Sequence, residues 1–429
     1  MTDLGTTGLG TTGLGTTWGG THHFEATRLH RPASVDELQS LVAGLPAVRA
    51  LGTRHSFTAL ADLPGGDLVS VAGLPAELRV DADAATVTVG AGTRYGDLAP
   101  QLLERGLALA NLASLPHISI GGAVATGTHG SGDRVGSLAT AVTALELVTA
   151  DGELLAVSRQ SHPESFDGMV VSLGALGIVT RVTLRVEPAF EIAQTVFDDV
   201  PLDAVLAHYD EVTSAGYSVS CFLPWEGDGV QVWVKQRVTP GFEPVRELLD
   251  YAPADGPRHP VPGVATEATT EQGGVAGPWF ERLPHFRLAF EPSAGDEIQS
   301  EYLVPRDRAV EALETVRALG PLIAPLLFIS EIRTMAGDDL WLSPASGRAT
   351  VGIHFTWHPD PAGVLAVLPR LEAALAPFGA RPHWGKLFVA GAAAVAPLYP
   401  RAAEFAALAD RLDPNRKFRN PFLAEHLFG

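Results

Sequence analysis

A chain of 429 residues with 46% hydrophobic and 18% charged residues is long enough for two folded domains, and this composition excludes a largely disordered protein. The net charge of -19 at pH 7 argues against nucleic acid or an anionic membrane as a partner, because both would repel an acidic surface. The single cysteine, Cys221, excludes an intramolecular disulfide and a multi-cysteine metal site, and its apolar neighbours predict a buried thiol.

The N-terminus begins with a low-complexity segment. Residues 4–17 repeat LGTTG with a period of five, and such a tract buries too little apolar surface to offset its chain entropy. We expect residues 1–17 to form a mobile leader, with an ordered extra strand as the alternative. No secretory signal is recognisable, and no run reaches the ~20 apolar residues of a membrane span.

The first folded part is expected to mix strands and helices. Ser34 and Glu37 form a capping box before an apolar stripe, which predicts a helix that ends at Gly44. The remaining expected elements, in chain order, are strands at 48–52 and 86–90, a helix at 95–105, a hairpin at 144–157 and an alternating strand at 180–186. These elements predict an α+β domain over residues 18–188.

The composition of the chain changes near residue 189. A loop rich in proline and glycine covers 252–278, and helices are expected at 305–319 and 361–377 because each pattern is followed by glycine. We expect a second domain over residues 189–388. Residues 389–429 are expected to return to the first domain.

Two glycine-marked segments indicate a cofactor site. The run SIGGAVATGTHGSG at 119–132 has little side-chain bulk, so its backbone amides can approach an anionic ligand closely. The run LGTRHSF at 51–57 places His55 in a short turn. Neither run matches the P-loop or the G-x-G-x-x-G pattern. Together they favour a nucleotide-type cofactor and a nearby histidine that can bond to it, although each alone is also typical of an ordinary turn.

Polar residues interrupt two later strand patterns. In LLFISEIRTM, Glu331 and Arg333 are two residues apart, and in VGIHFTWH the same spacing separates His354 and Thr356. Two residues at this spacing share one face of a strand. A surface ion pair and a satisfied core histidine would explain each pair alone. Several such pairs in apolar strands favour a functional site, because buried charge must be paired or used.

A third polar segment, RPHWGKLF, is also expected to be a strand, with Lys386 and Trp384 on one face and His383 on the other. A neutral histidine can accept a hydroxyl proton near neutral pH, and a nearby lysine can stabilise the negative charge that develops on oxygen. The polar strands are therefore consistent with oxidation of an alcohol.

Six runs, in this order, resemble the vanillyl-alcohol-oxidase type of FAD flavoenzyme and, within it, the alditol oxidase group that acts on xylitol and sorbitol. They are LGTRHSF, NLASLPHISIGGAVATGTHGSG, EIRT, WLSPASGR, HFTW and RPHWGK, and the resemblance extends from about residue 17 to the C-terminus. It implies an α+β, two-domain FAD-binding fold of the PCMH type. The substrate (cap) domain of that fold is built on an antiparallel sheet flanked by helices.

The resemblance also implies an activity, namely oxidation of the C1 primary alcohol of an alditol to the aldose. Hydride passes to flavin N5, and O2 is reduced to H2O2. His354 and Lys386 would be catalytic, and the residues that bind substrate would be Ser114, Glu331, Arg333 and Thr356.

FAD would be held covalently through His55, and the lone cysteine disfavours a second, cysteinyl attachment. The other expected FAD contacts are Gly52, Thr53, Arg54, Ser56, Ser114, Ser119, Gly121, Gly122, Thr126, Gly127, Thr128, His129, Gly177 and Ile178.

Two other functions remain open from sequence. One is an aldonolactone oxidase or dehydrogenase of the same superfamily, and the other is a non-catalytic polyol-binding protein that lacks flavin. The expected partners are a small polyol and O2, with no metal, no nucleic acid and no membrane, in a cytoplasmic monomer. Five histidines are expected at the surface: His22, His23, His30, His259 and His285.

Overall fold

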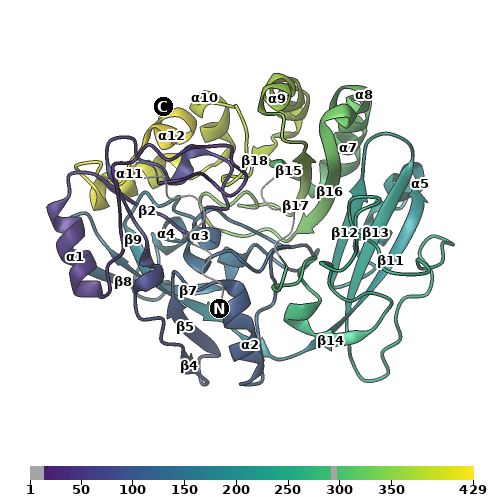
Figure 1. Ribbon diagram of the computed structural model, residues 1–429, viewed down its shortest axis with the longest axis horizontal. Coiled ribbons are helices and arrows are strands. Elements are labelled where there is room, and N and C mark those ends of the chain that lie inside the picture. The colour runs from purple at the N-terminus through teal and green to yellow at the C-terminus, as the bar shows by residue number, and fades with distance from the viewer. Residues whose placement is uncertain (1–13, 291–296) are drawn as a thin grey trace.

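The computed structural model describes residues 14–290 and 297–429. Elements from the first part of the chain, purple to blue in Figure 1, lie on one side of the molecule. The strands of the largest sheet, teal to green, lie on the other side, and the yellow C-terminal helices lie above the first part. The predicted α+β architecture is confirmed.

Two small sheets organise the first part. A three-stranded parallel sheet has the order β1-β3-β2, and a five-stranded antiparallel sheet has the order β4-β5-β9-β7-β8. The strands are β1 Arg28–His30, β2 Val48–Ala50, β3 Asp67–Val69, β4 Arg79–Asp81, β5 Thr86–Gly90, β7 Val142–Val148, β8 Leu154–Ser158 and β9 Ile178–Arg185. A short pair, β6 Leu107–Ala108 with β10 Glu187–Pro188, follows. Alternate side chains of β9 are buried, as its sequence pattern predicts.

Helices pack around these sheets. The predicted capping box is present at the first helix, because Ser34 Oγ accepts from the Glu37 amide at 3.2 Å and the Glu37 carboxylate accepts from the Ala33 amide at 2.8 Å. The helices are α1 Val35–Gly44, α2 Tyr95–Leu103, α3 Ile120–Ala125 and α4 Phe166–Val170. α3 is formed by residues of the glycine-rich run and contacts β9.

The largest sheet has eight strands in the order β14-β11-β13-β12-β16-β17-β15-β18, and its neighbouring strands are antiparallel. The strands are β11 Glu191–Pro201, β12 Ser218–Leu223, β13 Gly229–Arg237, β14 Ala276–Pro278, β15 Ile298–Pro305, β16 Leu327–Met335, β17 Thr350–Trp357 and β18 Arg381–Pro382. Cys221 is buried in β12, as predicted.

Helices cover one face of this sheet. α7 and α9 contact each other and both contact β15. Beneath them Ile353, Phe355 and Trp357 of β17 are fully buried, and the last two rings stack at 5.0 Å, so the predicted core face is confirmed. The helices of this part are α5 Leu202–Ala207, α6 Tyr209–Thr213, α7 Ala309–Ala318, α8 Gly320–Ile323 and α9 Pro361–Leu375. The opposite face is left for the polar residues of the same strands.

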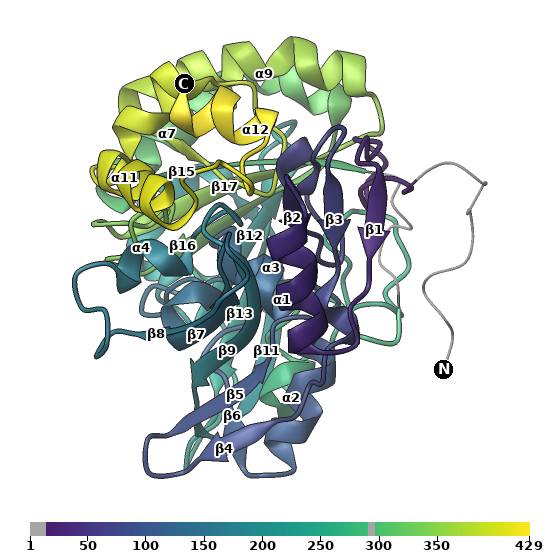
Figure 2. The ribbon, with the colours of Figure 1, turned by 90° about the vertical axis from the view of Figure 1, so that its left-hand side faces the viewer.

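The last segment of the chain packs on the first part, as the yellow helices of Figure 2 show. Asn420 Nδ2 donates to the carbonyls of Leu60 and Asp62 at 3.0 and 2.8 Å. The buried Arg49 guanidinium donates to the carbonyl of Phe418. The helices here are α10 Ala392–Val395, α11 Ala402–Leu412 and α12 Pro421–Leu423.

Two expectations about local structure are corrected. The strand expected over 381–388 ends at Pro382, and a turn follows, so the alternation predicted for its side chains does not hold. The mobile leader was expected to reach residue 17. Thr17 is instead buried, and Thr16 pairs with His23, so residues 14–17 are part of the fold. Residues 1–13 of the leader lie outside the described residues.

The segment Pro361–Phe378 meets the length and composition of a membrane-crossing helix, which the sequence pattern alone did not single out. Helices on the cores of globular proteins pass the same test. Val364, Val367 and Leu371 of this segment are buried, and α9 contacts β15 of the large sheet.

Candidate active site

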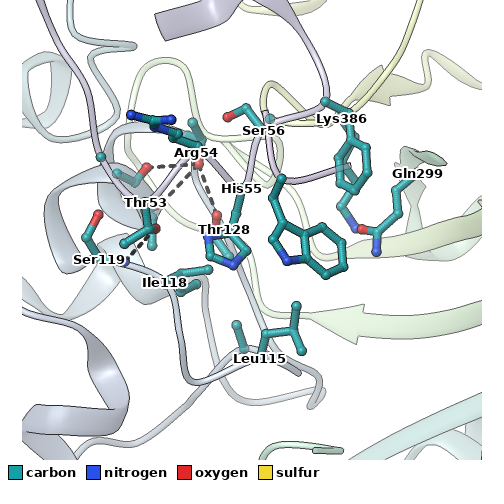
Figure 3. A pocket seen from close by; sticks show the side chains of 18 of the residues that line it. Thr53, Arg54, His55, Ser56, Leu115, Ile118, Ser119, Thr128, Gln299 and Lys386 are labelled. Carbon is teal, nitrogen blue, oxygen red and sulfur yellow. Dashed lines mark hydrogen bonds between the residues drawn. The ribbon is translucent and has the colours of Figure 1, made fainter. Parts of the chain in front are cut away.

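A cavity of about 750 Å³ is lined by residues of both parts of the chain. Its size is in the range of cofactor and ligand pockets. Figure 3 shows Thr53, Arg54 and Ser119 on one side of His55, and Lys386 with Gln299 on the other. The two ends of this cavity differ in the way that they are built.

One end is formed by glycine-rich backbone. A Cβ added to Gly52 would lie 2.9 Å from Ser119 Oγ, and one added to Gly121 would lie 3.0 Å from the Ala91 side chain. The Ser119 amide donates to Thr53 Oγ1 at 3.2 Å, which ties the two glycine-marked loops together (Figure 3). Small residues at these positions let the two loops approach closely and keep the cavity wall mostly backbone. Such a wall suits the pyrophosphate and ribose of a dinucleotide.

His55 lies at this end with an unsatisfied nitrogen. Its ring stacks on Trp18 at 5.6 Å between centroids, and its Nδ1 is buried with no hydrogen-bond partner among the described residues. Burial lowers the pKa of His55 to about 4, with a further contribution from His117. A buried, neutral imidazole with a free nitrogen fits a covalent attachment point for a cofactor.

The residue before this histidine has an unusual backbone. Arg54 has φ of 65°, a left-handed conformation that favours glycine. Its guanidinium donates to the Leu14 carbonyl at 2.9 Å. The turn therefore directs the neighbouring imidazole while holding the end of the leader against the fold.

The other end of the cavity is the polar face of the large sheet. Register places Glu331 of β16 opposite His354 of β17, which in turn lies opposite Glu301 of β15. Three strands thus contribute one row of titratable side chains. Gly352 lies next to this row, and a Cβ there would lie 2.7 Å from Glu301 Oε1, so glycine makes room for that carboxylate.

Glu301 is the centre of the charge network. Its carboxylate, with no exposed side-chain surface, lies 2.8 Å from Arg333 Nη2, 3.0 Å from Lys386 Nζ and 3.2 Å from His129 Nε2. Burial alone would raise its pKa, but Arg333 and Lys386, with a hydrogen bond from His129, hold the pKa of Glu301 well below its usual range. The network therefore contains a permanent negative charge beneath Lys386 and Arg333.

Lys386 and His354 form a close pair. Lys386 Nζ lies 2.6 Å from His354 Nδ1, and His354 Nε2 lies 3.1 Å from Thr356 Oγ1. Burial, reinforced by Lys386, lowers the pKa of His354 to about 4, so this imidazole is neutral at pH 7. Burial also lowers the pKa of Lys386, against the effect of Glu301. A neutral base beside a cation is the arrangement that proton removal from an alcohol requires.

Glu331 and Arg333 share a face of β16, as predicted. Glu331 Oε2 lies 3.6 Å from Arg333 Nε, and Arg333 Nη1 lies 3.5 Å from Ser114 Oγ. Burial opposes ionisation of both groups, but Arg333 lowers the pKa of Glu331, and Glu301 with Glu331 raises the pKa of Arg333. The pair offers one acceptor and one donor of fixed charge to a ligand.

The cavity brings most of the predicted residues together. Those that line it are Gly52, Thr53, Arg54, His55, Ser56, Ser114, Ser119, Gly121, Gly122, Thr126, Thr128, His129, Gly177, Glu331, Arg333, His354, Thr356 and Lys386. Two of the predicted residues do not line it. Gly127 takes a left-handed conformation (φ 66°) just after α3, and Ile178 is fully buried in a core cluster with Val148.

Other residues of the site were missed or misplaced. Gln299 and Glu301 are two residues apart on β15, the same spacing that identified the polar pairs of the neighbouring strands, so the sequence contained this signal. His285 was expected at the surface but is buried against Glu331. His383, expected to face away from Lys386, also lines the cavity, whereas Trp384 donates to the Leu342 carbonyl in the core.

His129, Glu301 and His383 place three possible ligand atoms within 4.8 Å of one another. The same carboxylate is already paired with Arg333 and Lys386. Two cations at this distance would repel a metal ion, so the cluster is better explained as part of the charge network.

Comparisons with known proteins agree with this geometry. Residues 26–158 match the FAD binding domain family, and residues 296–426 match the D-arabinono-1,4-lactone oxidase family. The chain is 49% identical to alditol oxidase of a Streptomyces species, over 96% of this chain and 98% of that protein. It is 31% identical to L-gulono-1,4-lactone dehydrogenase of Mycobacterium tuberculosis, over 94% and 97% of the two chains.

A solved structure of cholesterol oxidase from B. sterolicum has the same fold. It superposes with a TM-score of 0.77 over 96% of both chains, at 17% sequence identity, a level that supports the fold alone. The 49% identity to the Streptomyces alditol oxidase, over 96% of this chain, shows the family as well as the fold. The chain belongs to the vanillyl-alcohol-oxidase-type family of FAD flavoproteins, in the group that includes alditol oxidase.

Proposed function

We propose that this enzyme oxidises the terminal primary alcohol of alditols such as xylitol and sorbitol to the aldose, with O2 as the final electron acceptor. One observation carries the proposal. The His354–Lys386 pair and the Glu331–Arg333 pair lie at one end of the same cavity whose other end holds His55 and the glycine-rich loops. The 49% identity to an alditol oxidase supports the same substrate class.

His55 and the two glycine-marked loops would hold FAD, with the bond formed at the imidazole. The bound flavin supplies the hydride acceptor, which O2 reoxidises with release of H2O2. The unpaired, buried Nδ1 of His55 and the close approach of Gly52 to Ser119 fit this cofactor. The low pKa of His55 keeps its ring neutral and therefore nucleophilic.

His354 would take the hydroxyl proton at Nδ1. With a proton on Nε2 that donates to Thr356 Oγ1, 3.1 Å away, the lone pair would lie on Nδ1. Lys386 Nζ lies 2.6 Å from this nitrogen, so a bound substrate hydroxyl would replace the direct Lys386–His354 contact. The hydroxyl would lose its proton to the imidazole and receive a hydrogen bond from the ammonium. The charge that builds up on oxygen is thereby stabilised before hydride leaves the carbon.

Glu331 and Arg333 would recognise the remaining hydroxyls of the polyol. A carboxylate accepts from hydroxyl groups and a guanidinium donates to them, so the pair fixes which end of the chain reaches His354. Ser114, 3.5 Å from Arg333, adds a third contact near the glycine-rich run.

The direct test is peroxide release from purified, flavin-loaded protein given xylitol in air. We expect one H2O2 for each aldose formed. A protein that carries flavin but produces neither peroxide nor aldose from xylitol or sorbitol would refute the activity.

Attachment of FAD is tested separately with His55→Ala. The unmodified protein should keep its flavin fluorescence through denaturing electrophoresis, and the variant should lose it. Fluorescence that persists on the variant band would place the bond on another residue.

A lactone-oxidising activity is the second candidate, because residues 296–426 match the D-arabinono-1,4-lactone oxidase family. Comparison of kcat/KM for xylitol and for L-gulono-1,4-lactone decides between the two substrates. A colourless protein without flavin absorbance would instead indicate a polyol-binding protein with no redox activity.

A further inference from the structure

We propose that Lys235 and His285 are positioning residues, which hold Glu331 in one orientation for the substrate hydroxyls and so determine selectivity for polyols. The inference rests on the proposed function. It adds to the residues that touch substrate a buried series of hydrogen bonds, Lys235–His285–Glu331, which we call the relay. Neither residue lies on the strands that carry His354 or Glu301.

Lys235 begins the relay. It is on β13, two strands from β16, and only 1% of its surface is exposed. Its Nζ donates to the carbonyls of Leu283 and Pro284 at 2.5 and 3.3 Å, and it lies 3.1 Å from His285 Nδ1. These acceptors surround the Lys235 amino group with oxygen and nitrogen atoms of a single loop, and burial lowers its pKa to about 7. A buried lysine with this set of partners fixes the conformation of that loop.

His285 transfers this constraint to Glu331. Because Lys235 donates to Nδ1, the neutral imidazole carries its proton on Nε2, which lies 2.8 Å from Glu331 Oε1. Burial and the Lys235 charge lower the pKa of His285 to about 4, which keeps the ring neutral and preserves this tautomer. The carboxylate therefore receives a directed hydrogen bond at one oxygen and keeps Oε2 on the side of Arg333, 3.6 Å away.

Packing holds the imidazole in place. The rings of Phe222 and Trp233 meet His285 edge-on, each at 5.3 Å between centroids. The His285 amide also donates to the Ser114 carbonyl at 3.2 Å, so the loop is fastened to the glycine-rich part of the chain. A side chain enclosed in this way has little freedom to change its conformation when a different substrate binds.

The relay predicts a specific pattern of kinetic change. Loss of the hydrogen bond from His285 leaves Glu331 free to rotate, which weakens recognition of the additional hydroxyls but not proton removal by His354. A hydrogen bond to a charged group corresponds to about 10–100-fold in binding. The effect should therefore fall on KM for a polyol and spare a monohydric alcohol of the same length.

The experiment compares the flavin-loaded enzyme with its His285→Leu, His285→Gln and Lys235→Met variants on xylitol and on 1-pentanol. In His285→Leu we expect KM for xylitol to rise by about 10–100-fold, with a smaller change in kcat and the rate on 1-pentanol retained. In Lys235→Met, KM for xylitol should also rise. In His285→Gln, which keeps a donor, the rise in KM should be smaller than in His285→Leu. Unchanged selectivity in His285→Leu would overturn the proposal.

Thr270→Val is the matched control. Thr270 is buried and donates to the same Pro284 carbonyl at 2.8 Å, whereas the polar partners of Glu331 among the described residues are His285 and Arg333. Its removal should lower the melting temperature without changing the ratio of xylitol to 1-pentanol activity. An equal loss of selectivity in this variant would show that disturbance of the loop, and not the relay, is responsible.

A second measurement is independent of turnover. In protein labelled with ¹⁵N-histidine, the His285 signal, assigned with His285→Gln, should show a neutral ring protonated at Nε2. Its pKa should rise in Lys235→Met. A proton on Nδ1 would overturn the relay even in an active enzyme. A relay with the expected tautomer in an enzyme inactive on polyols would refute the proposed substrate class alone.

Discussion

The two ends of the cavity hold their ligands by different physical means. At the His55 end, Gly52 and Gly121 bring loops so close together that an added Cβ would lie 3.0 Å or less from a neighbouring side chain. At the Glu301 end, strands carry charged side chains that neutralise one another. The first end depends on the absence of side-chain volume, and the second depends on the position of charge.

Substitutions at the two ends should therefore have different effects. Added volume in the glycine loops should interfere with cofactor retention and leave the chemistry of any loaded enzyme intact. Removal of a charge on the sheet should impair the chemistry and leave the cofactor bound, because the buried partner of that charge loses its counter-ion.

The largest effect is expected from His354→Ala. Without the base, kcat should fall by about 10²–10⁴-fold, while the flavin content per protein remains that of the unmodified enzyme. Stopped-flow reduction of the flavin by xylitol measures the step directly. A variant that loses flavin together with activity would break the proposed separation of the two ends.

Gly121→Val tests the other end. The new side chain would meet Ala91, and overpacking of this kind costs about 1–3 kcal/mol, so we expect flavin per protein to fall by about tenfold or more. The ratio of flavin to protein absorbance measures retention, and turnover per bound flavin should stay close to that of the parent. Gly44→Val, at a glycine with open space around it, is the control and should retain its flavin.

The pH dependence follows from the low pKa of His354. Only the neutral ring accepts a proton, and this pKa is lowered to about 4, so kcat/KM should fall about tenfold for each pH unit below it. Above that pH, kcat/KM should be constant until Lys386, whose pKa is also lowered, loses its proton. Because the pKa of His354 is lower in the folded than in the unfolded protein, the neutral ring contributes to the free energy of unfolding. This contribution is lost as pH falls from 6.5 toward 4. Circular dichroism must therefore show folded protein at each pH. In Lys386→Met the acid limb should move to higher pH, and an unmoved limb would contradict the role of Lys386.

The smallest effect is expected from Arg54→Gly. Relief of the left-handed conformation, about 1 kcal/mol, is opposed by loss of the hydrogen bond to Leu14, about 0.5–1.5 kcal/mol. Urea unfolding should therefore detect a change in the free energy of unfolding below about 1 kcal/mol, with the flavin still attached. A large loss of stability or of attachment would assign the Arg54 side chain a role in the cofactor site.

Much of the site was predictable because its signals are local. The spacing of two between Glu331 and Arg333, and between His354 and Thr356, places each pair on one face of any strand, and both pairs line the cavity. The capping box at Ser34 likewise depends on neighbours three residues apart. The prediction of a strand beyond Pro382 was wrong, because the buried hydrophobic residues there lie in a turn. Trp384, for example, is fully buried and donates to the Leu342 carbonyl.

The family, the residue types at both ends of the cavity and the order of the main elements could be read from the sequence, because motifs and periodicity are properties of short segments. The three-dimensional fold was needed to show that Glu301 is the common counter-ion of Arg333 and Lys386, and that Lys235 reaches Glu331 through His285. These contacts join residues 32 to 85 positions apart whose meeting depends on strand register and loop packing. Buried charge becomes interpretable only when its partners are known, because burial and pairing act on its pKa in opposite directions.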